Sequence, residues 1–251
     1  MRSLVAALIT IPSLAFVPQI KRKMLLNMRP KLAMKSDGFD LDKARRSLEN
    51  LLDETEDATN AVDGSPLMTT TGLNRLRKEI KLLSELESSD AALKELTALW
   101  YEEHGKLSSA KLREADKLVN QQQYQLAERI LKELCAQYGS SWAEPHSRVA
   151  HLYFVQGRME ECTAECQRAL SIKPWHFVAL NEMTMANAFL HDLASMRQWA
   201  ALQLPAMTGD GIASEKRKQW VFEATNCAKR VLMNEETRLQ MSFNAVDDEW
   251  Q

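Results

Sequence analysis

Two cysteines four residues apart, Cys162 and Cys166, are the strongest candidates for chemistry in the sequence. A spacing of four on a helix places both thiols on one face, where they could bind a metal or form a redox pair. No CxxC motif and no pair of histidines accompanies them, and both thiols fall on the apolar face of the predicted helix. Buried cysteine commonly packs as a small hydrophobic residue, so packing is the preferred interpretation. The sequence therefore predicts no metal site and no cofactor.

The five histidines form no ligand set or catalytic pair by their spacing. None stands in an HExxH motif, and the chain has no P-loop, no GxGxxG motif and no Ser-His-Asp nucleophile elbow. The acidic pairs Glu102-Glu103 and Glu160-Glu161 are typical of solvent-exposed helix faces. These observations predict no catalytic residues and favour a protein that is not an enzyme.

The overall charge of −2 conceals an uneven distribution along the 251 residues. Residues 1–36 contain seven basic residues and no acidic one, and removing these seven from 32 leaves 25 basic residues against 34 acidic ones. The remaining chain therefore carries a charge of −9, which disfavours general binding to nucleic acid. The hydrophobic fraction of 45% and the charged fraction of 26% are those of a soluble globular protein.

The N-terminal segment has the features of a targeting sequence. An apolar run, Leu4 to Phe16, follows Arg2, and it is short and interrupted by Pro12. Ser13-Leu14-Ala15 fits a signal-peptidase site, and Phe16-Val17-Pro18 then opens a basic, acid-free segment. This order resembles the bipartite presequence of plastid proteins in diatoms and related algae, which implies that residues 1–36 are a signal plus transit peptide. A simple secretory signal, with a secreted or endomembrane location, is the alternative. No transmembrane segment is predicted for the chain after it.

The pattern of apolar residues predicts helices throughout the rest of the chain, with essentially no sheet. Residues 37–71 are predicted to contain a helix, Asp40 to Glu56, and a linker, Thr55 to Thr71. Leu73, Leu76, Ile80 and Leu83 then indicate a helix packed on a neighbour. Ser89-Asp90 predicts the start of another helix, which we expect Gly105 to end.

Two stretches match each other at an offset of 35 residues. In 143–176 two predicted helices flank Gly157, and Pro174 ends the second. Residues 108–141 repeat the pattern, with these matches in size and polarity: Ala115 with Ala150, Leu118 with Tyr153, Tyr124 with Met159, Ala127 with Cys162, Leu131 with Cys166, and Leu134 with Ala169. Residues 177–205 form a weaker third copy, because Thr184, Met196 and Gln203 fit the packing positions poorly. A last helix at 214–240 and a tail at 241–251 follow.

The 143–176 stretch resembles the tetratricopeptide repeat (TPR), and Leu99 to Val231 resembles TPR proteins of plants, algae and some bacteria. The fold class that this implies is all-α: a TPR-like solenoid of helical hairpins over residues 72–240, with the 214–240 helix covering its exposed end. In TPR proteins the first helix of each pair lines a concave groove. The resemblance places these residues there: Asp116, Val119, Asn120, His151, Phe154, Val155, Asn181, Met185, Ala188 and Phe189.

The predicted groove is partly apolar, which suits an amphipathic helix or an extended peptide. Leu112 and Asp116 stand where chaperone-binding TPR proteins have a Lys and an Asn that grip a carboxylate, so we expect no such clamp. The preferred hypothesis is a protein-protein interaction scaffold or adaptor in the plastid, in the assembly or stabilisation of a complex. The alternative is a helical-repeat RNA-binding protein acting on plastid transcripts, which the charge of −9 disfavours.

Overall fold

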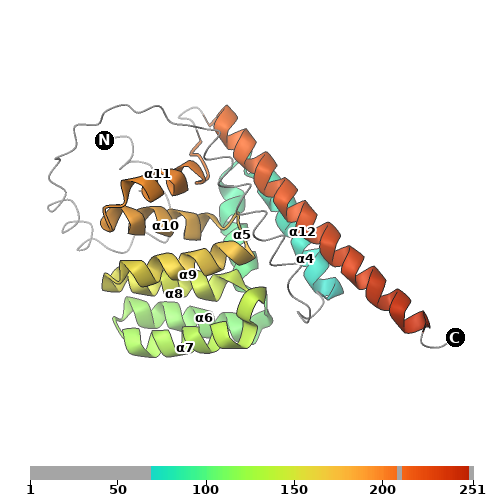
Figure 1. The fold of residues 1–251 in the computed structure, drawn as a ribbon, viewed down its shortest axis with the longest axis horizontal. Coiled ribbons are helices and arrows are strands. Elements are labelled where there is room, and N and C mark those ends of the chain that lie inside the picture. The colour runs from blue at the N-terminus through green and yellow to red at the C-terminus, as the bar shows by residue number, and fades with distance from the viewer. Residues whose placement is uncertain (1–68, 208–210, 249–251) are drawn as a thin grey trace. The chain divides into compact units, whose positions relative to one another are not determined.

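The computed structural model describes residues 69–207 and 211–248, with side chains described as far as Met241. Within these ranges the chain forms helices and their connections and no strand, which confirms the predicted all-α class (Figure 1). All described residues belong to one compact unit, Leu41–Gln251. The predictions for the presequence, for the Asp40 to Glu56 helix and for most of the linker lie outside the described residues.

The first described helix, α4 (Thr70–Glu85), begins inside the predicted linker. The hydroxyl of Thr69 accepts a hydrogen bond from the backbone N–H of Gly72 at 3.2 Å. This bond satisfies one of the N–H groups that the first turn leaves without a partner, so the helix begins at Thr70. The linker prediction is therefore wrong for its last residues.

The second helix, α5 (Ala91–Tyr101), ends before the predicted stop at Gly105. Gly105 is instead the first residue of α6 (Gly105–Asn120), and its φ of +86° lies in the left-handed region. That conformation costs glycine little and lets the chain turn sharply between α5 and α6. The glycine was correctly placed at a helix boundary, but it begins a helix instead of ending one.

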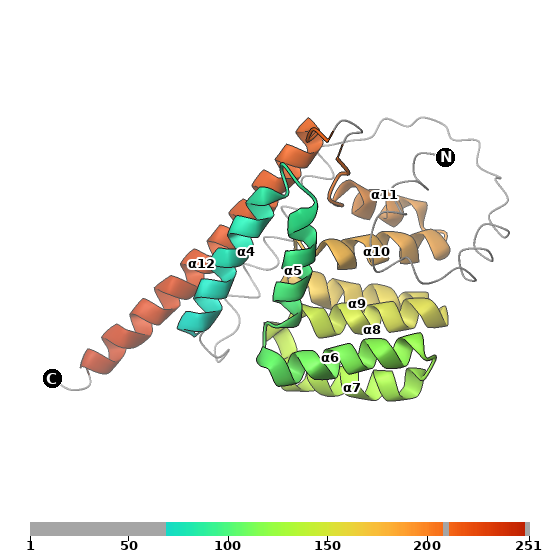
Figure 2. The same cartoon turned by 180° about the vertical axis from the view of Figure 1, so that it is seen from behind.

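Three helix pairs follow in order. They are α6 with α7 (Tyr124–Tyr138), α8 (Ala143–Gln156) with α9 (Met159–Ile172), and α10 (Phe177–Phe189) with α11 (Leu193–Ala201). A short 3-10 helix, η2 (Gly139–Ser141), separates the first two pairs. The small residues that match between the two repeats are fully buried, which lets the paired helices approach closely: Ala115, Ala127, Ala150 and Cys162. Helix α7 packs on α8 and α9 packs on α10, while α8 also contacts α6 and α10. Helices α6, α8 and α10 are therefore neighbours in one layer (Figure 2).

The third pair departs from the sequence-based prediction at its second helix. Helix α11 ends at Ala201, before the poorly fitting Gln203, and none of its side chains is fully buried. Thr184 of α10 was expected to fit its packing position poorly, yet it is only 9% exposed. Its hydroxyl donates to the carbonyl of Leu180 at 2.9 Å, which removes the cost of burying it.

The last helix, α12 (Glu215–Asp248), is longer than predicted and packs elsewhere. Ser214 caps it as expected, by accepting from the backbone N–H of Arg217 at 3.2 Å. The helix continues past 240 into the predicted tail, and its principal neighbour is α4 instead of the end of the third pair. The apolar faces of the two helices meet in one cluster of buried residues: Leu76, Leu82, Leu83, Leu86, Val221, Ala224, Cys227 and Ala228.

Arg217 fixes the position of α12 against α4 and α5. Its side chain is 1% exposed and donates to the carbonyl of Leu86 and to the carboxylate of Asp90, both at 2.6 Å.

Among the described helices, none combines the length and the apolar character that a membrane span requires.

Candidate functional site

The ten predicted groove residues lie on α6, α8 and α10, the three helices that form one layer (Figure 2). Helix α6 carries Asp116, Val119 and Asn120, helix α8 carries His151, Phe154 and Val155, and helix α10 carries Asn181, Met185, Ala188 and Phe189. Phe154 and Asn181 are buried, Asn120 and Phe189 are exposed, and the other six are half-buried. The accessible part of this surface is thus smaller than the sequence suggests.

Phe154 and Phe189 form the clearest contact among these residues. Their ring centroids lie 5.6 Å apart with the ring planes at 77°, an edge-to-face arrangement. Phe154 is 7% exposed, whereas Phe189 is 38% exposed. The prediction that both rings are presented at the surface is therefore wrong for Phe154, because the ring of Phe189 and the neighbouring helices cover it. Among the ten residues, Phe189 is the large apolar side chain that remains exposed.

Three of the four polar side chains of the predicted groove, His151, Asn181 and Asp116, are paired within the chain. Nδ1 of His151 lies 2.7 Å from Oε1 of Glu182 on α10, a residue that sequence reasoning missed. The amide of Gln203 donates to Oδ1 of Asn181 at 3.3 Å, and the hydroxyl of Tyr101 donates to the carboxylate of Asp116. Because these three groups already have partners within the chain, the side chains of this surface that are left to bind another molecule are mainly apolar.

Sequence reasoning also missed a buried network centred on Glu79 of α4. The Glu79 carboxylate accepts hydrogen bonds from two buried indoles, from Trp100 Nε1 at 2.7 Å and from Trp175 Nε1 at 2.7 Å. The Lys173 ammonium donates to both carboxylate oxygens at 2.9 Å, and the pair is almost fully buried. Lys173 also lies 3.6 Å from Glu103, which Arg75 binds at 2.9 Å. This network joins α4, α5 and the connection between α9 and α10.

The charge state of Glu79 follows from these contacts. Burial alone would raise the pKa of Glu79, but the Lys173 ammonium and the hydrogen bonds to the carboxylate hold that pKa below its usual value. Burial would likewise lower the pKa of Lys173, but the carboxylates of Glu103 and Glu79 raise it. Both groups are therefore charged at neutral pH. One signal was available: Glu79 shares a helix face with Leu76 and Leu83, where an apolar residue is normal.

A second buried network surrounds Glu144 at the start of α8. Its Oε1 accepts from Nε of Arg148 at 2.9 Å, and its Oε2 lies 2.9 Å from Nε2 of His176. Nδ1 of His176 accepts the backbone N–H of Ala179 at 3.1 Å and so caps α10. That bond requires a lone pair on Nδ1, so Nε2 carries the proton and donates to Glu144. Burial would raise the pKa of Glu144, but the Arg148 guanidinium and the hydrogen bond from His176 lower it to about 2.

The two networks meet at Trp100. Its ring stacks on that of His176 with centroids 4.5 Å apart, and its backbone carbonyl accepts from Nε1 of Trp142 at 2.8 Å. Trp142 and Trp175 are 0% and 4% exposed, and each lies at a junction between helices. The two buried networks thus connect α4 and α5 to the helix pairs. Their buried groups are not presented to a substrate.

The described cysteines lie in packed surroundings. Cys162 and Cys166 are fully buried, and Cys227 is 7% exposed. The neighbouring Cys162, together with burial, holds the pKa of Cys166 well above its usual value, and burial raises the pKa of Cys135 to about 12. Over residues 69–207 and 211–248, no three His, Cys, Asp or Glu side chains are grouped so that they could hold a metal ion.

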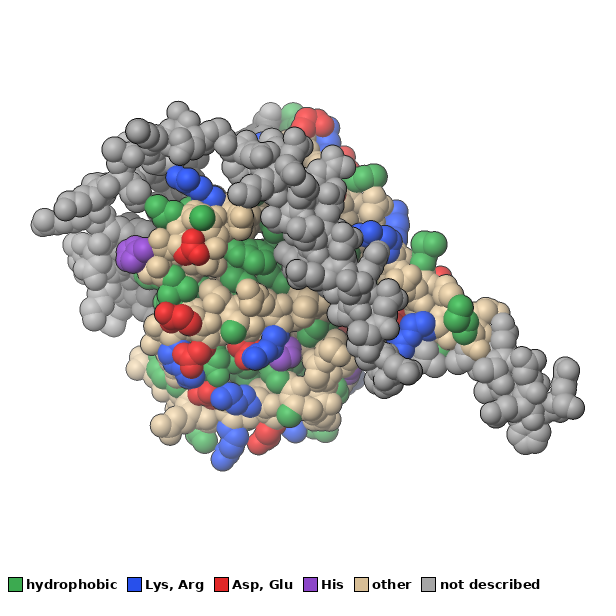
Figure 3. Space-filling model, in the orientation of Figure 1, with side chains coloured by type: hydrophobic (Ala, Val, Ile, Leu, Met, Phe, Trp, Pro, Cys, Tyr) green, Lys and Arg blue, Asp and Glu red, His purple; other side chains and the backbone are tan. Residues whose placement is uncertain are grey.

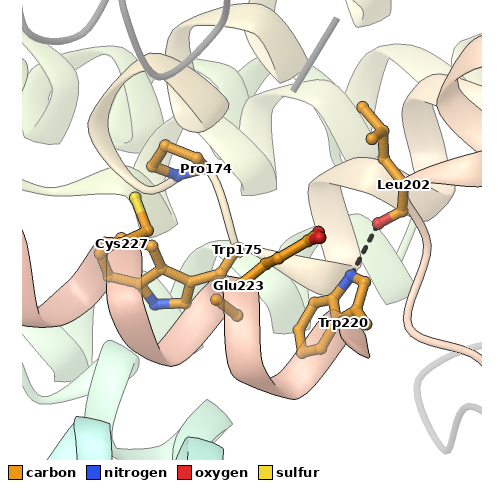
Figure 4. Close-up of a pocket in the computed structure, with 7 residues that line it drawn as sticks. Pro174, Trp175, Leu202, Trp220, Glu223 and Cys227 are labelled. Atoms are coloured by element: carbon orange, nitrogen blue, oxygen red, sulfur yellow. Dashed lines mark hydrogen bonds between the residues drawn. The ribbon is translucent and has the colours of Figure 1, made fainter. Parts of the chain in front are cut away.

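A small cleft lies where α12 meets the connection between α9 and α10 (Figure 4). Its free volume is about 20 Å³, room for about one water molecule. It is lined by Pro174, Trp175, Leu202, Trp220, Glu223, Ala224 and Cys227. The indole N–H of Trp220 donates to the carbonyl of Leu202 at 2.8 Å and closes one side. None of the ten groove residues lines this cleft.

Comparison with known proteins does not assign the chain to a family: no family model, no curated protein and no solved structure matches it.

Proposed function

We propose that the chain is a non-enzymatic adaptor that binds another protein through the surface of α6, α8 and α10. The observation that carries the proposal is Phe189, a large apolar side chain left 38% exposed beside polar neighbours that already have partners. A partner that buries this ring gains apolar burial without breaking a hydrogen bond of the surface. An amphipathic helix or an extended peptide that presents an apolar side chain suits such a site. Assembly or stabilisation of a plastid complex is the proposed context.

Replacing Phe189 with alanine is expected to weaken partner binding about tenfold or more, because exposed aromatic anchors dominate the affinity of many interfaces. The free energy of unfolding should change by no more than about 1 kcal/mol, since the ring is partly solvated. The measurement is affinity purification of the full chain with quantitative mass spectrometry of the proteins recovered, followed by titration of the enriched partner.

The matched control is Leu126→Ala, which removes an exposed apolar side chain of similar exposed fraction, 43%, from α7. If both variants recover the same partners as the natural chain, the α6, α8 and α10 surface is not the binding site. Nuclease treatment before purification tests the RNA alternative, because partners bridged by RNA would then be lost.

The proposed location in a secondary plastid rests on residues 1–36, with Phe16 following Ala15. These residues are expected to carry a fluorescent reporter into the plastid of a diatom, and Phe16→Ala should leave the reporter outside. Fluorescence microscopy is the measurement. Plastid import of the substituted reporter at the natural level would contradict a route that depends on Phe16, and secretion of both reporters would support the secretory alternative.

A further inference from the structure

The outer face of α12 carries apolar and basic side chains together. Phe222 and Met233 are 62% and 64% exposed, and Lys218 and Lys229 are exposed beside them. At 100° per residue these four fall within about 60° of the helix circumference and about 22 Å of its length. Figure 3 shows hydrophobic and basic side chains exposed along this helix. We call the four residues the α12 stripe.

The stripe points away from the rest of the described helices. Helix α12 buries Val221, Ala224 and Ala228 against α4 and α5, on the side of the helix away from the stripe. Phe222 and Met233 therefore lie outside the buried core of the fold. Exposing large apolar side chains to water carries no benefit for stability. Together with the neighbouring lysines, Phe222 and Met233 form a face with both apolar and basic groups accessible to a binding partner.

The charge around the stripe is opposite to that of the chain as a whole. Residues 216–233 contain five basic residues, of which Arg217 is buried against Asp90 and the other four are exposed, and one acidic residue, Glu223, within a chain of net charge −2. Acidic groups do border the stripe: Glu215 binds Lys218 at 2.8 Å, and Glu236 binds Arg77 of α4 at 2.5 Å. Arg77 neutralises Glu236, and the pair of Glu215 with Lys218 cancels. Lys216, Lys229 and Arg230 against Glu223 leave the segment positive, which favours an anionic surface.

We propose that the α12 stripe binds peripherally to an anionic membrane surface. Lysines beside scattered aromatic and apolar side chains suit the interface, where the ammonium groups meet lipid phosphates and the apolar groups enter the headgroup boundary. A partner helix fits less well, because Asn226 and Lys229 interrupt the apolar spacing that a helix seam needs. A nucleic-acid backbone would make no use of Phe222 and Met233.

The test is sedimentation of the full chain with vesicles of phosphatidylglycerol and phosphatidylcholine, 30:70, and with vesicles of phosphatidylcholine alone. The chain should bind the anionic vesicles, and binding should fall as salt is raised. Two double variants remove the two components: Lys218→Glu with Lys229→Glu, and Phe222→Ser with Met233→Ser. Each is expected to lower the partition coefficient about tenfold or more, since each basic residue and each apolar side chain at the surface contributes several-fold.

The N-terminal basic segment could bind the same vesicles, so matched variants are required. Lys111→Glu on α6 and Leu126→Ser on α7 make the same kinds of change at exposed positions outside the stripe, and they should leave partitioning unchanged. Circular dichroism and thermal melting establish that all variants fold. Partitioning that is equal for the stripe variants and the natural chain, or equal on neutral and anionic vesicles, would overturn the proposal.

Discussion

Replacing Glu79 with alanine is expected to lower the free energy of unfolding by on the order of 3–5 kcal/mol. The change leaves the Lys173 ammonium buried without the carboxylate that binds it through two hydrogen bonds of 2.9 Å. It also leaves the indole N–H groups of Trp100 and Trp175 without their acceptor. A buried charge that loses its partner costs several times more than a lost surface pair. Urea denaturation followed by circular dichroism measures the difference.

The control is Glu85→Ala on the same helix. Glu85 is exposed and its Oε1 lies 4.0 Å from the Lys81 ammonium, so its loss should change stability by about 0.5 kcal/mol or less. Both changes replace a glutamate of α4 with alanine, so they remove the same side chain from a buried and from an exposed position. Removing both charges, as Glu79→Leu with Lys173→Met, should recover part of the loss. A cost below about 1 kcal/mol for Glu79→Ala would show that the buried network does not hold these helices together.

Acidification should destabilise the protein through Glu144 by about 3 kcal/mol. The folded chain lowers the pKa of Glu144 from 4.5 to about 2, a difference of about 2.5 pH units at 1.36 kcal/mol each. Because the folded pKa is the lower one, the folded state holds the carboxylate ionised while the unfolded state takes up a proton first. The stabilisation is therefore fully present above about pH 5 and is lost as the pH falls through about 2.

This effect is isolated by comparing the natural chain with Glu144→Gln. Glutamine cannot ionise, so the variant should be several kcal/mol less stable at pH 7, where Arg148 loses its ion pair. The difference in unfolding free energy between the two proteins should then shrink by about 3 kcal/mol between pH 6 and pH 2. A difference that stays constant over this range would mean that Glu144 is not held ionised by Arg148 and His176.

The helices could be predicted from the sequence, because the spacing of apolar residues along the chain largely determines where helices form. The spacing of Ala150, Tyr153 and Cys162 places small and large residues on the faces where α8 and α9 meet, and all three are buried. The all-α class was predictable for the same reason: long amphipathic runs separated by few glycines and prolines favour helices over strands. Gly105 shows the limit of such patterns. A glycine indicates a helix boundary, but not whether it ends one helix or begins the next, and in the structure Gly105 has a positive φ and begins α6.

The partners of the charged residues could not be predicted from the sequence. Glu79 and Lys173 are 94 positions apart, and the chain order does not indicate that they meet. The pairing of α12 with α4 is equally non-local, and it places α12 away from the end that the repeat pattern assigns to it. The ten predicted groove residues lie on α6, α8 and α10. Only the packing of neighbouring helices decided that Phe154 is buried and Phe189 exposed. The exposure of a side chain depends on every atom around it in the folded protein, whereas helical periodicity depends only on residues close in the sequence.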